Sequence, residues 1–309
     1  MRVTVTGASG FVGSAVCRHL HALGWNVRGV VRRPLENAGW DVLRGDLRDD
    51  TIVKEAVHDT DLVVHAAGLA HIPLHRQIAR DFYVQNVEST LRLANAAADQ
   101  HVPLIFVSSS AAETAHGPYG ESKRIAEERL RELGTSRELH WAVLRPALLF
   151  GECDPGNFLR LIRIAAQRKL VYLDGGRARK SLTYVGNVGP AIAALVAQRL
   201  PQGRCYSLAD RRPYTVREIV EEICRQLGVP DPRLSLPAPV ACALGRIGSA
   251  AAAVGLPSPL RLDVVETLMR DAVVDTTALE EETGFLPPIS FPEGVRRTIV
   301  WWKEQRIVS

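Results

Sequence analysis

Three glycines lie between the first predicted strand and the first predicted helix, and they constrain the fold more than any other feature. The run Thr6-Gly7-Ala8-Ser9-Gly10-Phe11-Val12-Gly13 begins at the last residue of the β-branched segment 3–6. Glycines there let the backbone approach a pyrophosphate, whose charge the helix N-terminus favours, and Gly13 would let the helix pack closely on the sheet. The spacing is a variant of the usual G-x-G-x-x-G. It predicts a dinucleotide site, the alternative being a plain strand-to-helix turn.

Short β-branched runs alternate with helical patterns through the first half of the chain. Strands are predicted at 3–6, 27–31, 41–43, 62–65, 104–108 and 141–145, and helices at 12–23, 51–57, 81–98 and 119–133. Apolar strands separated by helices indicate a parallel sheet with both faces covered. The expected class is therefore α/β, with a doubly wound parallel sheet.

The pattern changes after Gly151, where the regular alternation stops. Helices are predicted at 157–168, 215–227 and 292–305, between segments rich in proline and glycine. We expect a nucleotide-binding domain over 1–150 and a smaller, mostly helical substrate domain over 151–309, with 180–199 returning to the first domain. The apolar stretch 240–256 is too short to span a membrane and is expected to be an amphipathic core helix rather than a membrane-surface helix.

Charge and cysteine usage exclude several protein classes. The 38 basic and 34 acidic residues leave a net charge of +4, which argues against a nucleic-acid-binding surface. The five cysteines are scattered, with no C-x-x-C pair and no zinc-site spacing, so we expect reduced thiols, no metal and a cytoplasmic location. The first residues enter a strand without an apolar signal segment, and no membrane association is expected.

The residues after the second and third predicted strands bear on cofactor choice. An acid after the second strand usually binds a ribose 2′-hydroxyl, whereas arginine accommodates a 2′-phosphate. This chain has Arg32-Arg33 there and no acid until Glu36, so NADP is favoured over NAD. The alternative is two solvated arginines. After the third strand, Asp46 could accept from an adenine amino group or could be an ordinary turn residue.

A candidate catalytic set follows. Tyr119 and Lys123 are separated by four residues, which puts them on one face of a helix. A nearby ammonium favours the phenolate, so Tyr119 could act as a base nearer neutral pH. With only five lysines against 33 arginines, Lys123 is informative; the alternative is a surface pair. Ser108-Ser109-Ser110 ends the fifth strand, where a hydroxyl could bind the substrate oxygen or simply cap backbone groups.

With these residues in place, the sequence resembles the extended short-chain dehydrogenases/reductases, in particular the nucleotide-sugar epimerase/dehydratase branch with its Rossmann-type domain. The resemblance covers nearly the whole chain. The segments that carry it are 6–13, 45–47, 65–68, 85–90, 108–110, 119–123, 144–151 and 184–188.

The resemblance implies residue roles. Tyr119 is implied as general acid/base, with Lys123 holding the nicotinamide ribose and Ser110 orienting the substrate hydroxyl. Cofactor contacts are implied for Gly7, Gly10, Phe11, Val12, Gly13, Arg32, Arg33, Asp46, Leu47, Ala66, Ala67, Gly68, Asn86, Ser108, Tyr119, Lys123 and Pro146. Asn157 and Lys180 match positions near the substrate diphosphate, although Lys180 could be a solvated loop lysine. Homodimers formed through the helices at 81–98 and 119–133 are common in the family.

Three departures from the family pattern limit what can be carried over. Ser110 and Tyr119 lie only nine residues apart, which removes a loop that normally shapes the sugar pocket. Arg32-Arg33 replaces the acid of NAD-using epimerases. Ala111-Ala112 stands where a 4,6-dehydratase has an acidic pair, which disfavours that branch.

The expected function is hydride chemistry at a sugar C4 of a nucleotide-diphosphate sugar, as a 4-epimerase or a 4-keto reductase. A hydroxysteroid-type or small ketone reductase is the enzyme alternative, because the shortened loop could admit an apolar substrate. A non-enzymatic NAD(P)-sensing protein is disfavoured by the intact set of Ser110, Tyr119 and Lys123.

Overall fold

The computed structural model describes residues 1–36, 38–70, 77–115, 117–253 and 261–305. The chain divides into two compact units. The first comprises 1–149, 183–209 and 274–289, and the second comprises 150–182, 210–273 and 290–309. The sequence did not indicate that 274–289 would belong to the first unit. Two short strands lie where the chain passes between units, β7 (Leu148–Phe150) and β10 (Leu182–Tyr184).

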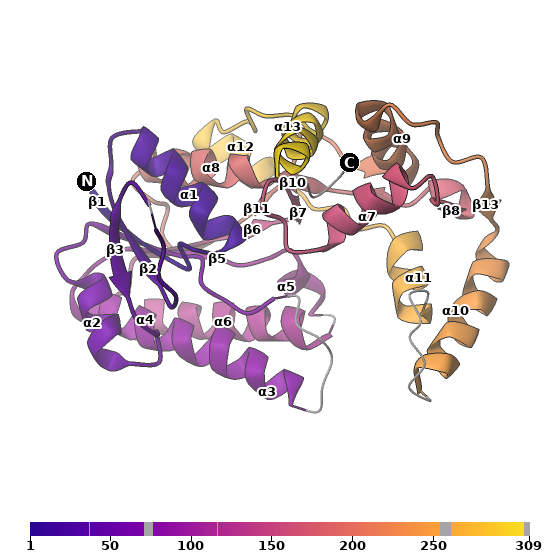
Figure 1. Ribbon diagram of the computed structural model, residues 1–309. Helices are drawn as coiled ribbons and strands as arrows, with labels where there is room; N and C mark the ends of the chain where they lie inside the picture. The colour runs from indigo at the N-terminus through magenta and orange to yellow at the C-terminus, as the bar shows by residue number, and fades with distance from the viewer. Residues whose placement is uncertain (37, 71–76, 116, 254–260, 306–309) are drawn as a thin grey trace. The chain divides into compact units, whose positions relative to one another are not determined.

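The first unit is built on a seven-stranded sheet in which every adjacent pair is parallel (Figure 1). Its order is β11-β6-β5-β4-β1-β2-β3. The strands are β1 (Arg2–Thr6), β2 (Asn26–Val31), β3 (Asp41–Arg44), β4 (Leu62–His65), β5 (Leu104–Val107), β6 (Trp141–Pro146) and β11 (Arg204–Leu208). The order reverses between β1 and β4, as in the Rossmann fold. The predicted doubly wound parallel sheet is confirmed.

Helices cover both faces of this sheet because its strands are apolar on both sides. Val64 packs in one core cluster with Val16 of α1, whereas its neighbour Val63 packs in the other with Leu93 of α4. The α-helices of this unit are α1 (Phe11–Ala22), α2 (Asp50–Val57), α3 (Ile78–Phe82), α4 (Ser89–Asp99), α5 (Ala111–Thr114), α6 (Gly117–Ser136), α8 (Val188–Ala197) and α12 (Thr277–Thr283). A π-helix (Tyr83–Glu88) and a 3₁₀ turn (Val185–Asn187) complete it.

The second unit is smaller and mainly helical. Its elements are α7 (Asn157–Ala166), β8 (Tyr172–Leu173), a 3₁₀ turn (Asp174–Gly176), β9 (Arg179–Lys180), β12 (Tyr214–Thr215), α9 (Val216–Leu227), β13 (Ser235–Leu236), α10 (Ala238–Ala253), α11 (Leu262–Met269) and α13 (Phe291–Glu304). A capping box fixes the start of α9: the Thr215 hydroxyl accepts from the Glu218 N–H, and the Glu218 carboxylate accepts from the Thr215 N–H. In α13, Trp302 is buried and Trp301 is half-buried, as expected for one inward-facing tryptophan.

The prediction that 240–256 forms a buried core helix is wrong for 240–253, the part that the structure describes. In α10, Val240, Leu244 and Ile247 are exposed, and within 238–252, where burial is described, only Ala241 and Gly245 are buried. The reason is that α10 packs on α11 through small residues: a Cβ at Gly245 would lie 3.0 Å from the backbone of Leu262. Residues 254–256 lie outside the described ranges. No helix in those ranges is long and apolar enough to cross a membrane.

Candidate active site

The glycine run forms a close-packed turn between β1 and α1. Gly7 has a φ of +70°, and a Cβ on it would lie 2.8 Å from the Cα of Ala67. A Cβ on Gly13 would lie 2.1 Å from the carbonyl oxygen of Gly7, so neither position can hold a larger residue. Gly10 precedes α1 and offers no capping side chain, which leaves the helix N-terminus as a suitable place for an anion. The turn therefore fits the pyrophosphate of a dinucleotide.

Positive charge gathers after β2 and β3. Arg32 and Arg33 follow β2 and are exposed. The Asp46 carboxylate accepts from Arg48, through the backbone N–H at 2.9 Å and through the guanidinium at 3.0 and 2.7 Å. These bonds hold the pKa of Asp46 below its ordinary value, and the charge of Arg32 acts in the same direction. The Asp46 carboxylate, which was expected to bind adenine, is therefore bonded to Arg48, a residue that the sequence did not indicate.

Two segments meet beside Lys123. Residues 66–68 follow β4, and a Cβ on Gly68 would lie 3.3 Å from the Lys123 ammonium and 3.1 Å from the Asn86 carbonyl oxygen. Asn86 lies in the π-helix, accepts from the N–H of Leu69 at 2.6 Å, and donates to the Leu69 carbonyl and the Ser122 hydroxyl, each at 3.0 Å. The amide therefore ties the segment after β4 to α6. π-Helices occur frequently at functional sites.

Tyr119 and Lys123 lie one turn apart on α6. The Lys123 ammonium is buried, donates to the Val107 carbonyl at 3.2 Å and lies 4.7 Å from the centre of the Phe106 ring. Burial lowers the pKa of Lys123 to about 8, against the opposing effect of Glu127. The lysine is therefore still an ammonium at pH 7.

The pKa of Tyr119 is raised, not lowered as the sequence led us to expect. Burial raises it, and a hydrogen bond with the Ser109 hydroxyl opposes the rise. The ring packs against Phe82, with 5.8 Å between the ring centres. In the protein by itself, Tyr119 thus remains a protonated phenol at neutral pH.

The three serines after β5 differ in their surroundings. Ser109 contacts the Tyr119 hydroxyl and accepts from the Ala111 N–H at 3.2 Å. Ser110, the serine chosen from the sequence, precedes α5, and its N–H donates to the Pro146 carbonyl at 3.0 Å. Ser108 is buried, and its hydroxyl has no hydrogen-bond partner among the described residues. The structure thus brings Ser109 to Tyr119, and which of three adjacent serines does so could not be read from sequence.

A buried histidine supports the site from within the sheet. His65 ends β4, with Nδ1 2.7 Å from the Thr6 hydroxyl and Nε2 2.9 Å from the Thr90 hydroxyl. Its ring stacks on the Phe106 ring. The Lys123 ammonium also lies over the Phe106 ring. Burial lowers the pKa of His65 to about 3, helped by the charge of Lys123, so the imidazole stays neutral.

The two predicted diphosphate residues belong to the second unit. Asn157 is the first residue of α7. Lys180 lies in β9 and is buried, and its ammonium donates to the backbone carbonyls of Thr267 and Arg270, at 2.7 and 2.5 Å. These bonds give Lys180 a structural use within its own unit. Its role toward a substrate stays a prediction, as does that of Asn157.

Comparison with known proteins agrees with this geometry. The chain is 24% identical to UDP-glucose 4-epimerase of Vibrio cholerae, with 96% of this chain and 94% of the relative covered. It is 27% identical to 2-alkyl-3-oxoalkanoate reductase of Stenotrophomonas maltophilia, with 96% and 98% covered. The fold matches the structure of UDP-glucose 4-epimerase from Thermotoga maritima with UDP-glucose, at a TM-score of 0.77, 21% identity, and coverage of 99% of this chain and 100% of that chain. The profile of one family matches residues 3–209, and the chain belongs to that family, the NAD dependent epimerase/dehydratase family.

Proposed function

We propose that this protein catalyses hydride chemistry at C4 of a nucleotide-diphosphate sugar, with Tyr119 as the general acid/base. The observation that carries the proposal is the arrangement of Tyr119 and Lys123 on one face of α6, with the Lys123 ammonium buried and bonded to the Val107 carbonyl at the end of β5. This group follows the end of β5, at the same sheet edge as the glycine turn. Ligands of open α/β sheets bind at that edge.

The cofactor site fits a nicotinamide dinucleotide. When bound, the dinucleotide accepts or supplies the hydride. The residues that would hold it are the glycine turn, with the backbone of Phe11 and Val12, the segment after β4 and the Lys123 ammonium. Leu47, Ser108 and Pro146 complete the proposed contacts. Arg32 and Arg33 support NADP, because a guanidinium pair suits a 2′-phosphate.

The chain's own groups would handle the proton. When the C4 hydroxyl is oxidised, the phenolate form of Tyr119 takes its proton, and becomes the phenol, as the hydride leaves the same carbon. In the reverse direction, Tyr119 returns the proton to the oxygen as the hydride arrives. The positive charge of Lys123 would favour the phenolate form of Tyr119. The Ser109 hydroxyl would form hydrogen bonds with the Tyr119 oxygen and the C4 oxygen of the substrate. An epimerase performs both directions on one sugar, whereas a 4-keto reductase performs only the second.

The nucleotide sugar is proposed from the family and from the UDP-glucose 4-epimerase relative. Asn157 and Lys180 are the proposed diphosphate neighbours, and the test of Lys180 is given in the Discussion.

The second candidate is reduction of an apolar ketone. Only the four-residue helix α5 (Ala111–Thr114) and a few residues lie between Ser110 and Tyr119. This short connection leaves less chain to enclose a sugar. The 2-alkyl-3-oxoalkanoate reductase relative covers the chain as completely as the epimerase does. Turnover of a β-keto acid, with no turnover of nucleotide sugars, would establish this alternative.

The test is a panel of UDP-, GDP- and dTDP-sugars with NAD⁺ and with NADPH, followed by nicotinamide absorbance and product stereochemistry. Tyr119→Phe should lower kcat by about 10²–10⁴-fold while cofactor binding is unchanged. The matched control is Tyr83→Phe, because Tyr83 is exposed. Full activity in Tyr119→Phe contradicts the proposal, and net cofactor consumption excludes simple epimerisation. Ser109→Ala should lower kcat more than Ser110→Ala does.

A further inference from the structure

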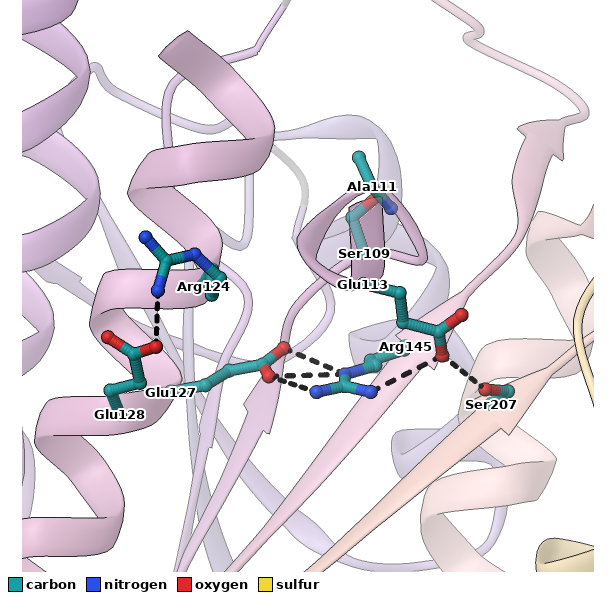
Figure 2. A network of polar contacts seen from close by, with 8 residues as sticks. All are labelled: Ser109, Ala111, Glu113, Arg124, Glu127, Glu128, Arg145 and Ser207. Atoms are coloured by element: carbon teal, nitrogen blue, oxygen red, sulfur yellow. Dashed lines mark hydrogen bonds and ion pairs between the residues drawn. The ribbon is translucent and has the colours of Figure 1, made fainter. Parts of the chain in front are cut away.

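One arginine bonds to two glutamates that come from different helices (Figure 2). Arg145 lies in β6, and its Nε is 3.0 and 3.1 Å from the two carboxylate oxygens of Glu127. A third bond joins Nη2 to the same carboxylate. Nη1 of Arg145 lies 3.3 Å from a carboxylate oxygen of Glu113, which also accepts from the Ser207 hydroxyl at 3.1 Å.

The two glutamates come from the helices that carry the reacting groups. Glu127 lies on α6, one turn after Lys123 and two turns after Tyr119, on the same helix face. Glu113 lies on α5, four residues after Ser109. Arg145 is therefore a bridge between the serine side and the tyrosine side of the site.

One arm of the bridge differs from an ordinary surface ion pair. The Glu127 side chain is 3% exposed and the Arg145 side chain 20% exposed, whereas the Glu113 side chain is 38% exposed. Next to them on α6, the Arg124–Glu128 pair is 42% and 45% exposed. Exposed pairs contribute little, whereas breaking a buried pair leaves an uncompensated charge. Arg124–Glu128 thus provides a matched control on the same helix.

The described part of the short connection between Ser110 and Tyr119 contains two residues with positive φ. Helix α5 has only four residues and ends at Thr114, its C-cap Ala115 has a φ of +48°, and Gly117 has a φ of +73°. A non-glycine residue in the left-handed region is costly and persists only where its surroundings hold it. Glu113 supplies side-chain bonds from α5 to β6 and β11.

We propose that Arg145 and Glu113 are positioning residues, which hold α5 against β6 and β11 and so fix the serine run that leads into α5 beside Tyr119, where a Cβ on the adjacent Gly120 would lie only 2.6 Å from the Ala111 carbonyl oxygen. This inference rests on the proposed function, because it gives Ser109 and Tyr119 a common task. It goes further by assigning the placement of the serine to side chains that touch neither substrate nor cofactor.

The first arm measures kinetics with UDP-galactose and UDP-glucose, and Glu113→Ala is the test variant. We expect kcat to fall about 10- to 100-fold, since small misplacements of a reacting group have effects of that size. KM and the dissociation constant of the cofactor should change less than about twofold, because the cofactor turn is untouched. Glu113→Gln keeps an acceptor for Ser207 and should recover most of kcat. Glu128→Ala should behave as wild type.

The second arm needs no turnover. Amide hydrogen exchange over 107–115 should rise about tenfold in Glu113→Ala and stay unchanged in Glu128→Ala. Unchanged exchange in Glu113→Ala overturns the bridge, and raised exchange with unchanged kcat overturns the positioning role. Tyr119→Phe is assayed alongside, and its activity separates a failure of the proposed function from a failure of the positioning role. If it keeps full activity, or if wild type turns over none of the UDP-, GDP- and dTDP-sugars of the panel, the proposed function fails and the positioning role with it. The exchange result still decides the bridge.

Discussion

Lys123 in the first unit and Lys180 in the second unit are alike in almost every local respect. Both are buried, both donate to backbone carbonyls, and burial lowers the pKa of both. In each case the charge of one carboxylate acts against the lowering of the pKa. This carboxylate is Glu127 for Lys123 and Asp271 for Lys180. Burial and a lowered pKa therefore do not identify a reacting lysine.

The two lysines differ in the residues that surround them. Lys123 shares a helix face with Tyr119 and lies against Gly68, where an added Cβ would come within 3.3 Å of the ammonium. Lys180 instead closes the end of α11, where it satisfies the carbonyls of Thr267 and Arg270. The comparison supports the proposed catalytic task of the first amine and shows a structural use of the second, whose place beside the substrate diphosphate stays a prediction.

The sharpest test of the comparison is Lys123→Met. We expect kcat to fall by about 10²–10⁴-fold, because the variant loses the charge that favours the phenolate and a contact with the cofactor ribose. Cofactor affinity should fall as well. Steady-state kinetics measures kcat, and a cofactor titration measures the affinity. A kcat near that of wild type would contradict the catalytic role of Lys123 that sets it apart from Lys180.

Lys180→Met should instead affect folding. It leaves the Thr267 and Arg270 carbonyls without their donor, which costs about 1–3 kcal/mol of unfolding free energy. Urea denaturation measures the loss, and Lys303→Met on exposed Lys303 is the control. If stability is kept while KM for the nucleotide sugar rises tenfold, Lys180 is a substrate ligand and the structural assignment is wrong.

A smaller effect should appear in the pH dependence of stability. Lys123 has a pKa of about 8 in the fold against an ordinary 10.5, so between these values the unfolded chain binds more protons. Stability from this group should therefore rise with pH across that window, by at most about 1.4 kcal/mol per pH unit. Denaturation of wild type and Lys123→Met from pH 7 to 10.5 isolates the contribution. A difference that is constant with pH would show that burial leaves this pKa unaltered.

Features set by local spacing were predictable from the sequence. The close approaches at Gly7 and Gly13 and the shared face of Tyr119 and Lys123 follow from short-range geometry. The alternating strands and helices of the first unit follow from apolar runs and turn residues, and the sheet agrees with them.

Features set by distant contacts were not predictable. The choice of Ser109 depends on how the chain turns into α5, which Glu113 and Arg145 influence across 32 residues. The raised pKa of Tyr119 depends on burial, which comes from packing of distant segments. The exposure of α10 was missed because apolar composition does not say whether a covering surface exists.

The division of the chain into interleaved segments bears on the order in which the protein can fold. One core cluster of the sheet contains Val188, Ile192 and Leu195 of α8, Tyr206 of β11 and Leu279 of α12. When only the first 149 residues have left the ribosome, six strands of the sheet and α1 exist, but the α8 and α12 side chains that complete the cover of the α1 face do not. Part of that face therefore stays exposed to water until the later segments emerge, so the closing contacts are long-range and late. Nucleotide affinity should consequently appear only near the end of synthesis, and a chaperone that shields apolar surface would act on the nascent sheet rather than on the second unit.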